Sequence, residues 1–352
     1  MIKSFKSLDG LQCISDCPRV DKCKLISFNT LNNICKYYKY YLLNETTLID
    51  SSGNCIYNYQ VSKIKYQMQG IQHLSLSTGC AIYSLTSLPN GNLAIGCNLG
   101  LIKICDIARS TCFFNFTHVN GQGIYSLAVI QNKYLASAGQ NGTIAIWDYN
   151  TGILKNTLYG HANAIYTINE LNNNDLLSGS CDSTVRIWNI NDGSLKLTLN
   201  FTSGCVYGLI QLKNGNLATM NTNTIIKIWN PFTGSLIQTI DTSDSPRIMT
   251  QLNNGDLPVG NIVGNLTVYD PVTYKPKYTL LGHNNDISRI IQLENDDIVS
   301  SSYDHTVLIW DWNTKSLKFN LTGHSNEVWG LSLLKNGYLV TAGKDSKIIV
   351  WK

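Results

Sequence analysis

The chain is built from short runs of apolar residues rich in Ile, Val and Thr, separated by polar turns. Runs of this length and composition predict β-strands. Seven of them end on a pair of residues, usually an aromatic residue followed by a polar one, with steps of 42, 41, 41, 40, 41 and 41 residues. A repeat of that length indicates one supersecondary unit copied along the chain. The seven pairs are Cys105-Asp106, Trp147-Asp148, Trp188-Asn189, Trp229-Asn230, Tyr269-Asp270, Trp310-Asp311 and Trp351-Lys352.

Each unit is predicted to hold four strands. The first strand ends in a turn that often contains Asn-Gly, as in 88–93, 212–217 and 334–339, and Asn-Gly tolerates the positive φ that a tight hairpin needs. Segments such as 176–180 and 184–188 supply the second and third strands. One four-stranded sheet leaves a face uncovered, so neighbouring units must stack on one another.

We therefore expect an all-β fold, in which seven four-stranded antiparallel blades over residues 71–352 close into a β-propeller. The last unit stops at its third strand, and residues 71–76 have the alternation of a missing fourth strand. We expect 71–76 to pair with 347–351, which leaves no open sheet edge. We expect residues 1–60 to form a separate module and 61–70 to form a linker.

Three units share polar residues at the same spacing. His161, His283 and His324 each follow a Gly and precede an Asp by 21 residues, and that Asp precedes a Trp by six. A Ser or Thr lies four residues before each Asp. The pattern resembles that of the WD-repeat family. The sets are His161, Ser178, Asp182, Trp188; His283, Ser300, Asp304, Trp310; and His324, Thr341, Asp345, Trp351.

The resemblance implies a structural role for these sets, in which the histidine bridges the hydroxyl and the carboxylate and the hydroxyl also meets the tryptophan. Such a network is stable only when every buried polar group has a partner. A Ser-His-Asp triad for hydrolysis is the alternative. The chain holds three copies of the set, and in each the tryptophan N–H would donate a hydrogen bond to the hydroxyl. Both points favour the structural role.

Other units depart from the pattern. The second has His118, Ser137 and Trp147 but Asn141 in place of the Asp, while the first, fourth and fifth lack both His and Asp. The fifth also has Pro258 inside its second strand. Proline cannot donate to a strand ladder, so we expect the fifth blade to be the loosest.

One aromatic position recurs at the start of the first strand. In the WD-repeat family the matching position lies on the top face, around the central channel, so we expect a partner-binding ring of aromatic residues that small neighbouring residues leave accessible. Acidic residues and Arg289 and Lys344 would add charge at its rim. Packing alone is the alternative explanation, because aromatic side chains serve both purposes. The expected binding face comprises Tyr83, Tyr125, Tyr166, Tyr207 and Trp329 with Glu327 and Asp286.

The first 55 residues hold five of the eleven cysteines, and the six in the repeats look like ordinary small apolar residues. Cys13-Ile14-Ser15-Asp16-Cys17 is predicted to be helical, followed by Cys23, a strand over 25–29 and Cys35. This resembles part of the PAN/apple domain family, which implies the disulfides Cys17–Cys23 and Cys13–Cys35. In that family Cys55 would pair with a cysteine upstream of Cys13, and since the sequence has none there, either the module is truncated or the match is partial. A zinc site is a weaker alternative, since the spacing is not Cys-x-x-Cys.

Charge and composition exclude several classes of function. Residues 1–76 carry nine Lys/Arg and five Asp/Glu, whereas residues 77–352 carry 18 of each, which gives no basic footprint for nucleic acid. No apolar run is long enough to span a membrane. No catalytic, metal or cofactor site stands out.

We therefore expect a non-catalytic scaffold that binds a protein or peptide on the top face. The alternatives are an extracellular adhesion-type protein that binds carbohydrate or protein through the apple-like module, and a propeller hydrolase with an acidic channel. The apple resemblance implies an extracellular location if the N-terminus is truncated. Without it, the propeller implies the cytoplasm.

Overall fold

The computed structural model describes residues 70–118 and 121–352, together with eight short strands between residues 7 and 62. The chain divides into two compact units, 1–66 and 67–352, and each is described by itself. Among the described residues no helix is long and apolar enough to cross a membrane.

The described strands of the first unit form four two-stranded sheets, β1-β2, β3-β4, β5-β8 and β6-β7. The helix and the three cysteines expected between residues 13 and 23 lie outside the described residues, while Cys35 is the last residue of β4. The PAN/apple resemblance and its disulfides therefore stay a prediction. The strands are β1 (Ser7–Leu8), β2 (Leu11–Gln12), β3 (Phe28–Asn29), β4 (Ile34–Cys35), β5 (Leu42–Leu43), β6 (Thr47–Ile49), β7 (Cys55–Tyr57) and β8 (Val61–Ser62).

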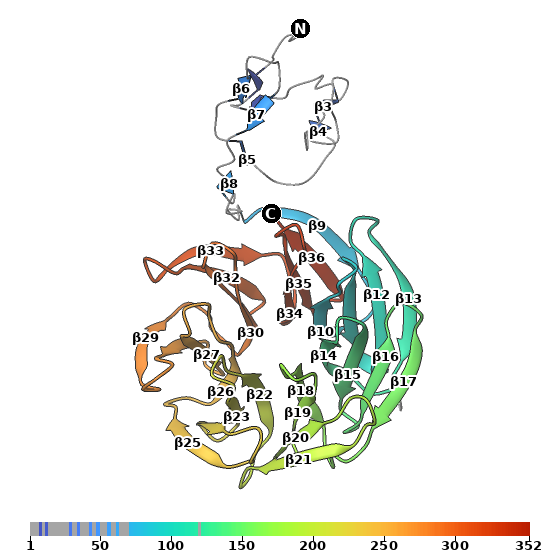
Figure 1. The fold of residues 1–352 in the computed structure, drawn as a ribbon, viewed down its shortest axis with the longest axis vertical. Helices are drawn as coiled ribbons and strands as arrows, with labels where there is room; N and C mark the ends of the chain where they lie inside the picture. Colours follow the sequence, from blue (N-terminus) through green and yellow to red (C-terminus); the bar gives the residue numbers. More distant parts are fainter. Residues whose placement is uncertain are drawn as a thin grey trace. The chain divides into compact units, whose positions relative to one another are not determined.

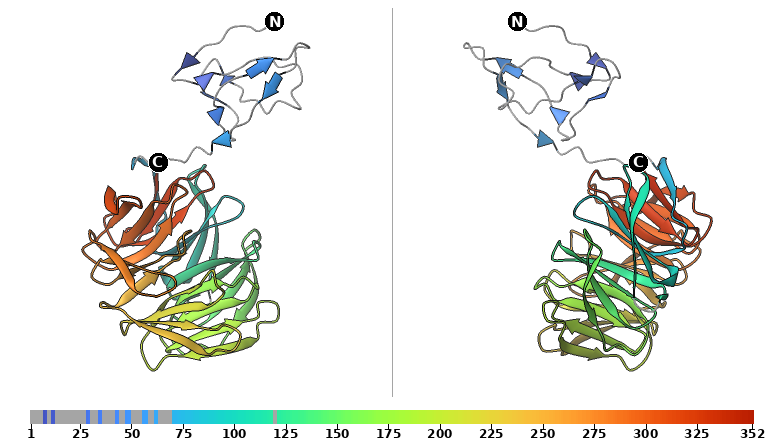
Figure 2. Two further views of the ribbon diagram at one scale, coloured as in Figure 1. Left: turned by 60° about the vertical axis from the view of Figure 1, so that its left-hand side comes forward. Right: turned by 90° about the vertical axis from the view of Figure 1, so that its right-hand side faces the viewer.

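The second unit contains seven four-stranded antiparallel sheets arranged in a ring, which confirms the predicted seven-bladed propeller (Figure 1). The first strand of each blade lies at the centre of the ring and the last lies outside (Figure 1). Figure 2 shows the same sheets from two other directions. Blade 1 is β10 (Ile82–Ser87), β11 (Leu93–Cys97), β12 (Leu101–Asp106) and β13 (Thr111–Thr117), with the 3-10 turn η1 (Asn98–Gly100). Blade 2 is β14 (Ile124–Ile130), β15 (Tyr134–Gly139), β16 (Ile144–Asp148) and β17 (Ile153–Leu158).

The middle blades repeat this order. Blade 3 is β18 (Ile165–Glu170), β19 (Leu176–Ser180), β20 (Thr184–Trp188) and β21 (Leu195–Asn200). Blade 4 is β22 (Val206–Gln211), β23 (Leu217–Asn221), β24 (Ile225–Trp229) and β25 (Leu236–Asp241). Blade 5 is β26 (Pro246–Met249), β27 (Leu257–Asn261), β28 (Leu266–Tyr269) and β29 (Pro276–Leu280).

The ring is closed by strands from both ends of the unit. Blade 6 is β30 (Ile287–Gln292), β31 (Ile298–Ser302), β32 (Thr306–Asp311) and β33 (Ser316–Thr322). Blade 7 is β34 (Val328–Leu333), β35 (Leu339–Gly343), β36 (Lys347–Trp351) and β9 (Gln72–Ser77). The strand expected at 71–76 begins one residue later, and Ile71 and Lys352 exchange two backbone hydrogen bonds beyond it.

The core lies between blades rather than inside each one. Buried residues form seven clusters, and each cluster joins residues of two neighbouring blades. Trp188 of blade 3, for example, packs with Ile146 of blade 2. Because one sheet cannot cover its own faces, each blade depends on both neighbours for burial of its apolar side chains.

Polar contacts also join neighbouring blades. In four blades, a backbone N–H in the turn after the first strand donates to the side-chain oxygen of a Gln or Glu of the following blade, at 2.7 to 2.9 Å. That Gln or Glu lies near the end of the first strand of its own blade. Each bond gives a backbone donor of a turn an acceptor from the adjacent sheet. The pairs are Gln131–Glu170, Asn172–Gln211, Lys213–Gln251 and Asn253–Gln292.

Blade 5 shows the effect of Pro258. Pro258 lies in β27, and the ladder with β26 ends at Met249↔Val259. Thr250 N still donates to Pro258 O at 3.2 Å, but proline has no N–H to return the bond. The first strand of blade 5 is therefore four residues long, whereas the other first strands have six or seven. That this blade is the loosest stays a prediction.

The six cysteines of the propeller are not simply small apolar residues, so that expectation is wrong. They form three disulfides, of which Cys80–Cys97 and Cys105–Cys112 lie within blade 1. The third, Cys181–Cys205, joins the turn after β19 to the segment before β22 and so connects blades 3 and 4. Strand pairing brings Cys105 and Cys112 together, since the two residues are directly opposite each other.

Candidate functional site

All seven first strands contain a β-bulge at their second residue. In each blade the pairing with the second strand skips that residue, and a bulge redirects the side chain it carries. The sequence repeat and the bulge together place one side chain per blade at the same point of the central channel. The seven residues are Tyr83, Tyr125, Tyr166, Tyr207, Arg247, Ser288 and Trp329.

Four tyrosines from blades 1 to 4 contact one another in order. The ring centroids of Tyr83 and Tyr125 are 5.6 Å apart, and those of Tyr125 and Tyr166 are 4.8 Å apart with nearly parallel planes. Tyr166 meets Tyr207 edge to face at 4.6 Å. These distances are typical of attractive aromatic pairs. Gly123 makes room for them, because a Cβ there would lie 2.9 Å from Tyr83.

Blades 5, 6 and 7 complete the circle by another route. The guanidinium of Arg247 lies 3.9 Å from the centroid of Tyr207 and donates from Nη2 to Tyr303 Oη at 2.8 Å. Tyr303, from the turn between β31 and β32, stacks on Trp329 at 4.9 Å, and Trp329 contacts Tyr83 at 5.2 Å. Blade 6 has the small Ser288 at the bulge, so Tyr303 occupies its sector.

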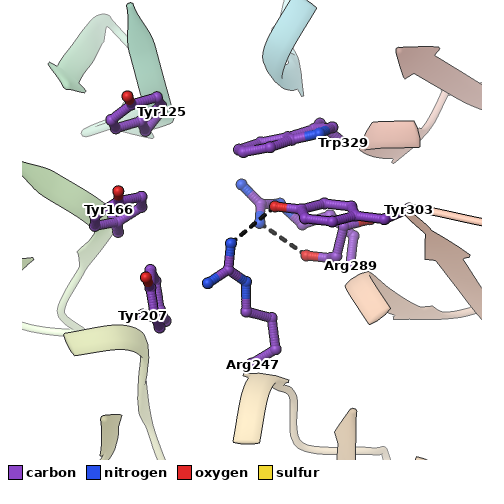
Figure 3. Close-up of a pocket in the computed structure, with 8 residues that line it drawn as sticks. Tyr125, Tyr166, Tyr207, Arg247, Arg289, Tyr303 and Trp329 are labelled. Carbon is purple, nitrogen blue, oxygen red and sulfur yellow. Dashed lines mark hydrogen bonds between the residues drawn. The ribbon is translucent and has the colours of Figure 1, made fainter. Parts of the chain in front are cut away.

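We call Tyr83, Tyr125, Tyr166, Tyr207, Arg247, Tyr303 and Trp329 the channel ring. Every member is half-buried, so each keeps some surface open to solvent. All ring members except Tyr83 line a small pocket, whose wall also includes Ser288 and Arg289 (Figure 3). The five aromatic residues and two acidic residues expected at the binding face thus all lie in or beside one site.

The acidic residues beside the ring are paired. Glu327 accepts a hydrogen bond from Trp329 Nε1 at 2.7 Å and lies 2.7 Å from Lys344 Nζ. Asp286 lies 3.6 Å from Arg247 Nε. Arg289 was expected at the rim, but its guanidinium lies in the pocket wall.

Burial disfavours the ionised form of two ring tyrosines. It raises the pKa of Tyr166 to about 12, and Tyr207 adds to the effect. It also raises the pKa of Tyr303 to about 12. Both hydroxyls therefore stay protonated at neutral pH and can donate hydrogen bonds to a ligand.

The residues of the three predicted polar sets lie together inside their blades. In blade 3, His161 Nδ1 is 2.7 Å from Asp182 Oδ2 and Nε2 is 2.7 Å from Ser178 Oγ. Trp188 Nε1 donates to the same Oγ at 2.8 Å. Burial opposes ionisation of Asp182, but hydrogen bonds from His161 and Thr184 outweigh it and hold the pKa of Asp182 well below its usual range.

Blades 6 and 7 repeat the arrangement. His283 bridges Asp304 and Ser300, each at 2.9 Å, and Trp310 donates to Ser300 at 2.9 Å. The matching contacts in blade 7 join His324 to Asp345 at 3.0 Å and to Thr341 at 2.8 Å, and Trp351 to Thr341 at 2.9 Å.

Blade 2 uses the same positions with different chemistry. His118 Nδ1 lies 2.9 Å from Ser137 Oγ, and its Nε2 lies 2.9 Å from Thr143 Oγ1. Thr143 in turn donates to Asn141 Oδ1 at 3.0 Å. Burial lowers the pKa of His118 to about 4, so this histidine is neutral at physiological pH.

Sequence reasoning missed Arg247 and Tyr303. Arg247 follows Pro246 as each ring tyrosine follows Ile or Val, so the repeat register alone could have located it. Tyr303 comes from the turn between the second and third strands, where the matching residues of blades 3 and 7 are Cys181 and Lys344 and are not aromatic. Over residues 70–118 and 121–352, no group of three or more His, Cys, Asp and Glu is placed to hold a metal ion.

Comparisons with known proteins agree with this architecture. Four segments, 110–148, 152–189, 274–311 and 315–352, match the family model "WD domain, G-beta repeat". These matches support a WD-repeat propeller. Among solved structures, the chain is similar to the crystal structure of the WD40 beta propeller domain of Doa1, with 20% identity, a TM-score of 0.71, and coverage of 80% of this chain and 96% of that one. At this identity the likeness concerns the fold alone. No curated protein sequence matches the chain.

Proposed function

We propose that this protein is a non-catalytic interaction scaffold whose channel ring binds a peptide segment of a partner protein. The observation that carries the proposal is the ring itself, in which the bulges of blades 2, 3, 4, 5 and 7 present a Tyr, Trp or Arg to one pocket. Tyr, Trp and Arg dominate binding hot spots, because they bury large areas at low entropic cost.

Burial of the hydroxyls supports a structural role for the Ser-His-Asp sets over a hydrolytic one. Ser178, Ser300 and Thr341 are 0% exposed, and each accepts a hydrogen bond from a tryptophan. A nucleophile has to reach its substrate, and these hydroxyls face the interior of a blade. The WD-repeat fold is also compatible with scaffolding.

The test uses peptides selected against the full chain from a phage-displayed library. Replacing Tyr166 and Tyr207 together by Ala should reduce binding of the selected peptides by at least ~30-fold, since each loses a large contact area. The thermal midpoint should change little, because both side chains are half-buried and neither belongs to the seven core clusters. Tyr159→Ala is the matched control, since Tyr159 is 68% exposed and lies outside the ring. Unchanged binding in the double variant would remove the channel ring as the binding site.

A further inference from the structure

The charges around the pocket do not balance. Two carboxylates, Asp286 and Glu327, face this end of the channel, and they are paired with Arg247 and Lys344. Arg289 is the third cation, and over residues 70–118 and 121–352 no carboxylate lies within 4.0 Å of it. A buried or half-buried guanidinium normally has an anionic partner, so the positive charge of Arg289 is unmatched.

Few of the hydrogen-bond donors of Arg289 are used. Nη1 donates to the Ser288 carbonyl oxygen at 2.9 Å. A guanidinium has five N–H groups, and among the described residues this carbonyl is the hydrogen-bond acceptor found for them. The guanidinium lies beside Tyr303 and points into the pocket (Figure 3). The carboxylate of Asp286 is already paired with Arg247. Arg247 is held there by its contacts with Tyr207 and Tyr303.

The aromatic faces do not favour a cationic guest. A cage of tyrosines and a tryptophan attracts cations through its π faces. Here the protein's own cations cover several of these faces, with Arg247 over Tyr207 and Tyr303 and Lys344 over Trp329 at 5.0 Å. A lysine or methylated lysine entering the pocket would also meet Arg289.

We infer that the pocket inside the channel ring takes an anionic group, a carboxylate or a phosphate on a side chain of the bound peptide, with Arg289 as its counter-charge. A guanidinium offers two parallel N–H groups to either anion. The protonated hydroxyls of the ring tyrosines are further donors, and the aromatic walls exclude water, which strengthens the charged contact. This inference rests on the proposed function and names the chemistry of its ligand.

Four peptide pools test the inference on the full chain. They are short capped peptides with mixed flanks of Gly, Ala, Ser and Tyr that differ in one central residue, namely Glu, phosphoserine, Gln or Lys. Fluorescence anisotropy should show the Glu pool, the phosphoserine pool or both binding at least ~10-fold more tightly than the Gln pool, and more weakly at high salt. Preference for Glu alone identifies a carboxylate, and preference for phosphoserine alone identifies a phosphate. Equal binding of the Gln pool, preference for Lys, or no binding of either anionic pool overturns the inference.

Variants tie the preference to one residue. Arg289→Gln should weaken the preferred anionic pool by ~10- to 100-fold, because hydrogen bonds to charged groups are the strong ones. Arg289→Lys keeps the charge and should retain part of the affinity, and it guards against a loss of fold in Arg289→Gln. Arg109→Gln removes the same charge from an exposed turn of blade 1 and should leave binding unchanged. An anionic preference that survives in Arg289→Gln assigns the site elsewhere and overturns the inference.

The two proposals fail in different ways. If the phage-selected peptides lose binding in the Tyr166/Tyr207 double variant but not in Arg289→Gln, the scaffold function stands and the anionic ligand does not. If Arg289→Gln abolishes binding of the anionic pool while the double variant retains it, the anion site stands without the aromatic ring.

Discussion

His118 Nε2 lies 2.9 Å from Thr143 Oγ1, at the point where the histidines of blades 3, 6 and 7 face a carboxylate. Asn141 replaces that carboxylate in blade 2. Because His118 is 1% exposed and has no carboxylate beside it to balance a proton, it must be neutral for the blade to stay packed.

Blade 2 should therefore weaken in mild acid. Burial lowers the pKa of folded His118 to about 4, below the ordinary value of 6.5. The unfolded chain then binds more protons between these values, so stability rises with pH there and is lost as pH falls from about 6.5 to about 4. Wild type should lose about 2 kcal/mol more stability than His118→Gln between about pH 7.5 and pH 5, measured by urea unfolding.

The carboxylates do not obscure this difference. The pKa of Asp182 and of Asp304 is held below its usual range, so their contribution is present above about pH 4 and is lost only below it. An equal pH response in wild type and His118→Gln would show that His118 is not the titrating group.

The polar sets should contribute directly to stability. Asp182→Ala removes the carboxylate that pairs with His161 and that accepts from Ala162 N and Thr184 Oγ1, and it leaves His161 Nδ1 only the longer contact with Thr184 Oγ1 at 3.2 Å, so we expect a loss of about 2–4 kcal/mol in the free energy of unfolding. Asp192→Ala, in the exposed turn between β20 and β21, is the control and should have little effect. Equal losses in the two variants would contradict a role for the His161 network.

Blade 5 should exchange its amide hydrogens faster than the other blades. Its β26 is short and lacks one ladder bond at Pro258, so local opening costs less free energy there. Hydrogen exchange followed by mass spectrometry should show lower protection over 246–261 than over 165–180 in blade 3. Protection equal to that of blade 3 would remove Pro258 as a weak point.

The disulfides should differ in their effect on stability. Cys181–Cys205 closes a separation of 24 residues and connects two blades, whereas Cys105–Cys112 closes 7 residues within one hairpin. In the chain-entropy model the longer loop contributes about 1 kcal/mol more. The Cys181→Ser/Cys205→Ser pair should therefore lower the unfolding midpoint more than Cys105→Ser/Cys112→Ser. Non-reducing peptide mapping checks that both bonds exist, and the opposite ranking would contradict the prediction.

The number of blades and their closure could be predicted because the repeat is visible residue by residue. A step of about 41 residues between closing pairs such as Trp188-Asn189 and Trp229-Asn230 counts the units, and the missing fourth strand of the last unit points to 71–76. Hydrogen bonding in the three polar sets likewise depends on positions that recur in register.

What escaped prediction depends on contacts that do not repeat. Tyr303 enters the channel ring because Ser288 leaves one sector empty, and no periodic pattern couples those two residues. Cys181 and Cys205 come from different blades and meet only when the sheets stack. Arg247 holds the same repeat position as the ring tyrosines, but the expected ring contained aromatic residues alone.

The pairing of β9 with β36 has a consequence for how the protein is made. Residues 72–77 leave the ribosome before any other part of the propeller, yet their partner, residues 347–351, is the last part of it to emerge. During synthesis β9 therefore has no partner strand while blades 1 to 6 are made. Newly made chains carry an unpaired strand edge until the rest of blade 7 has been synthesised.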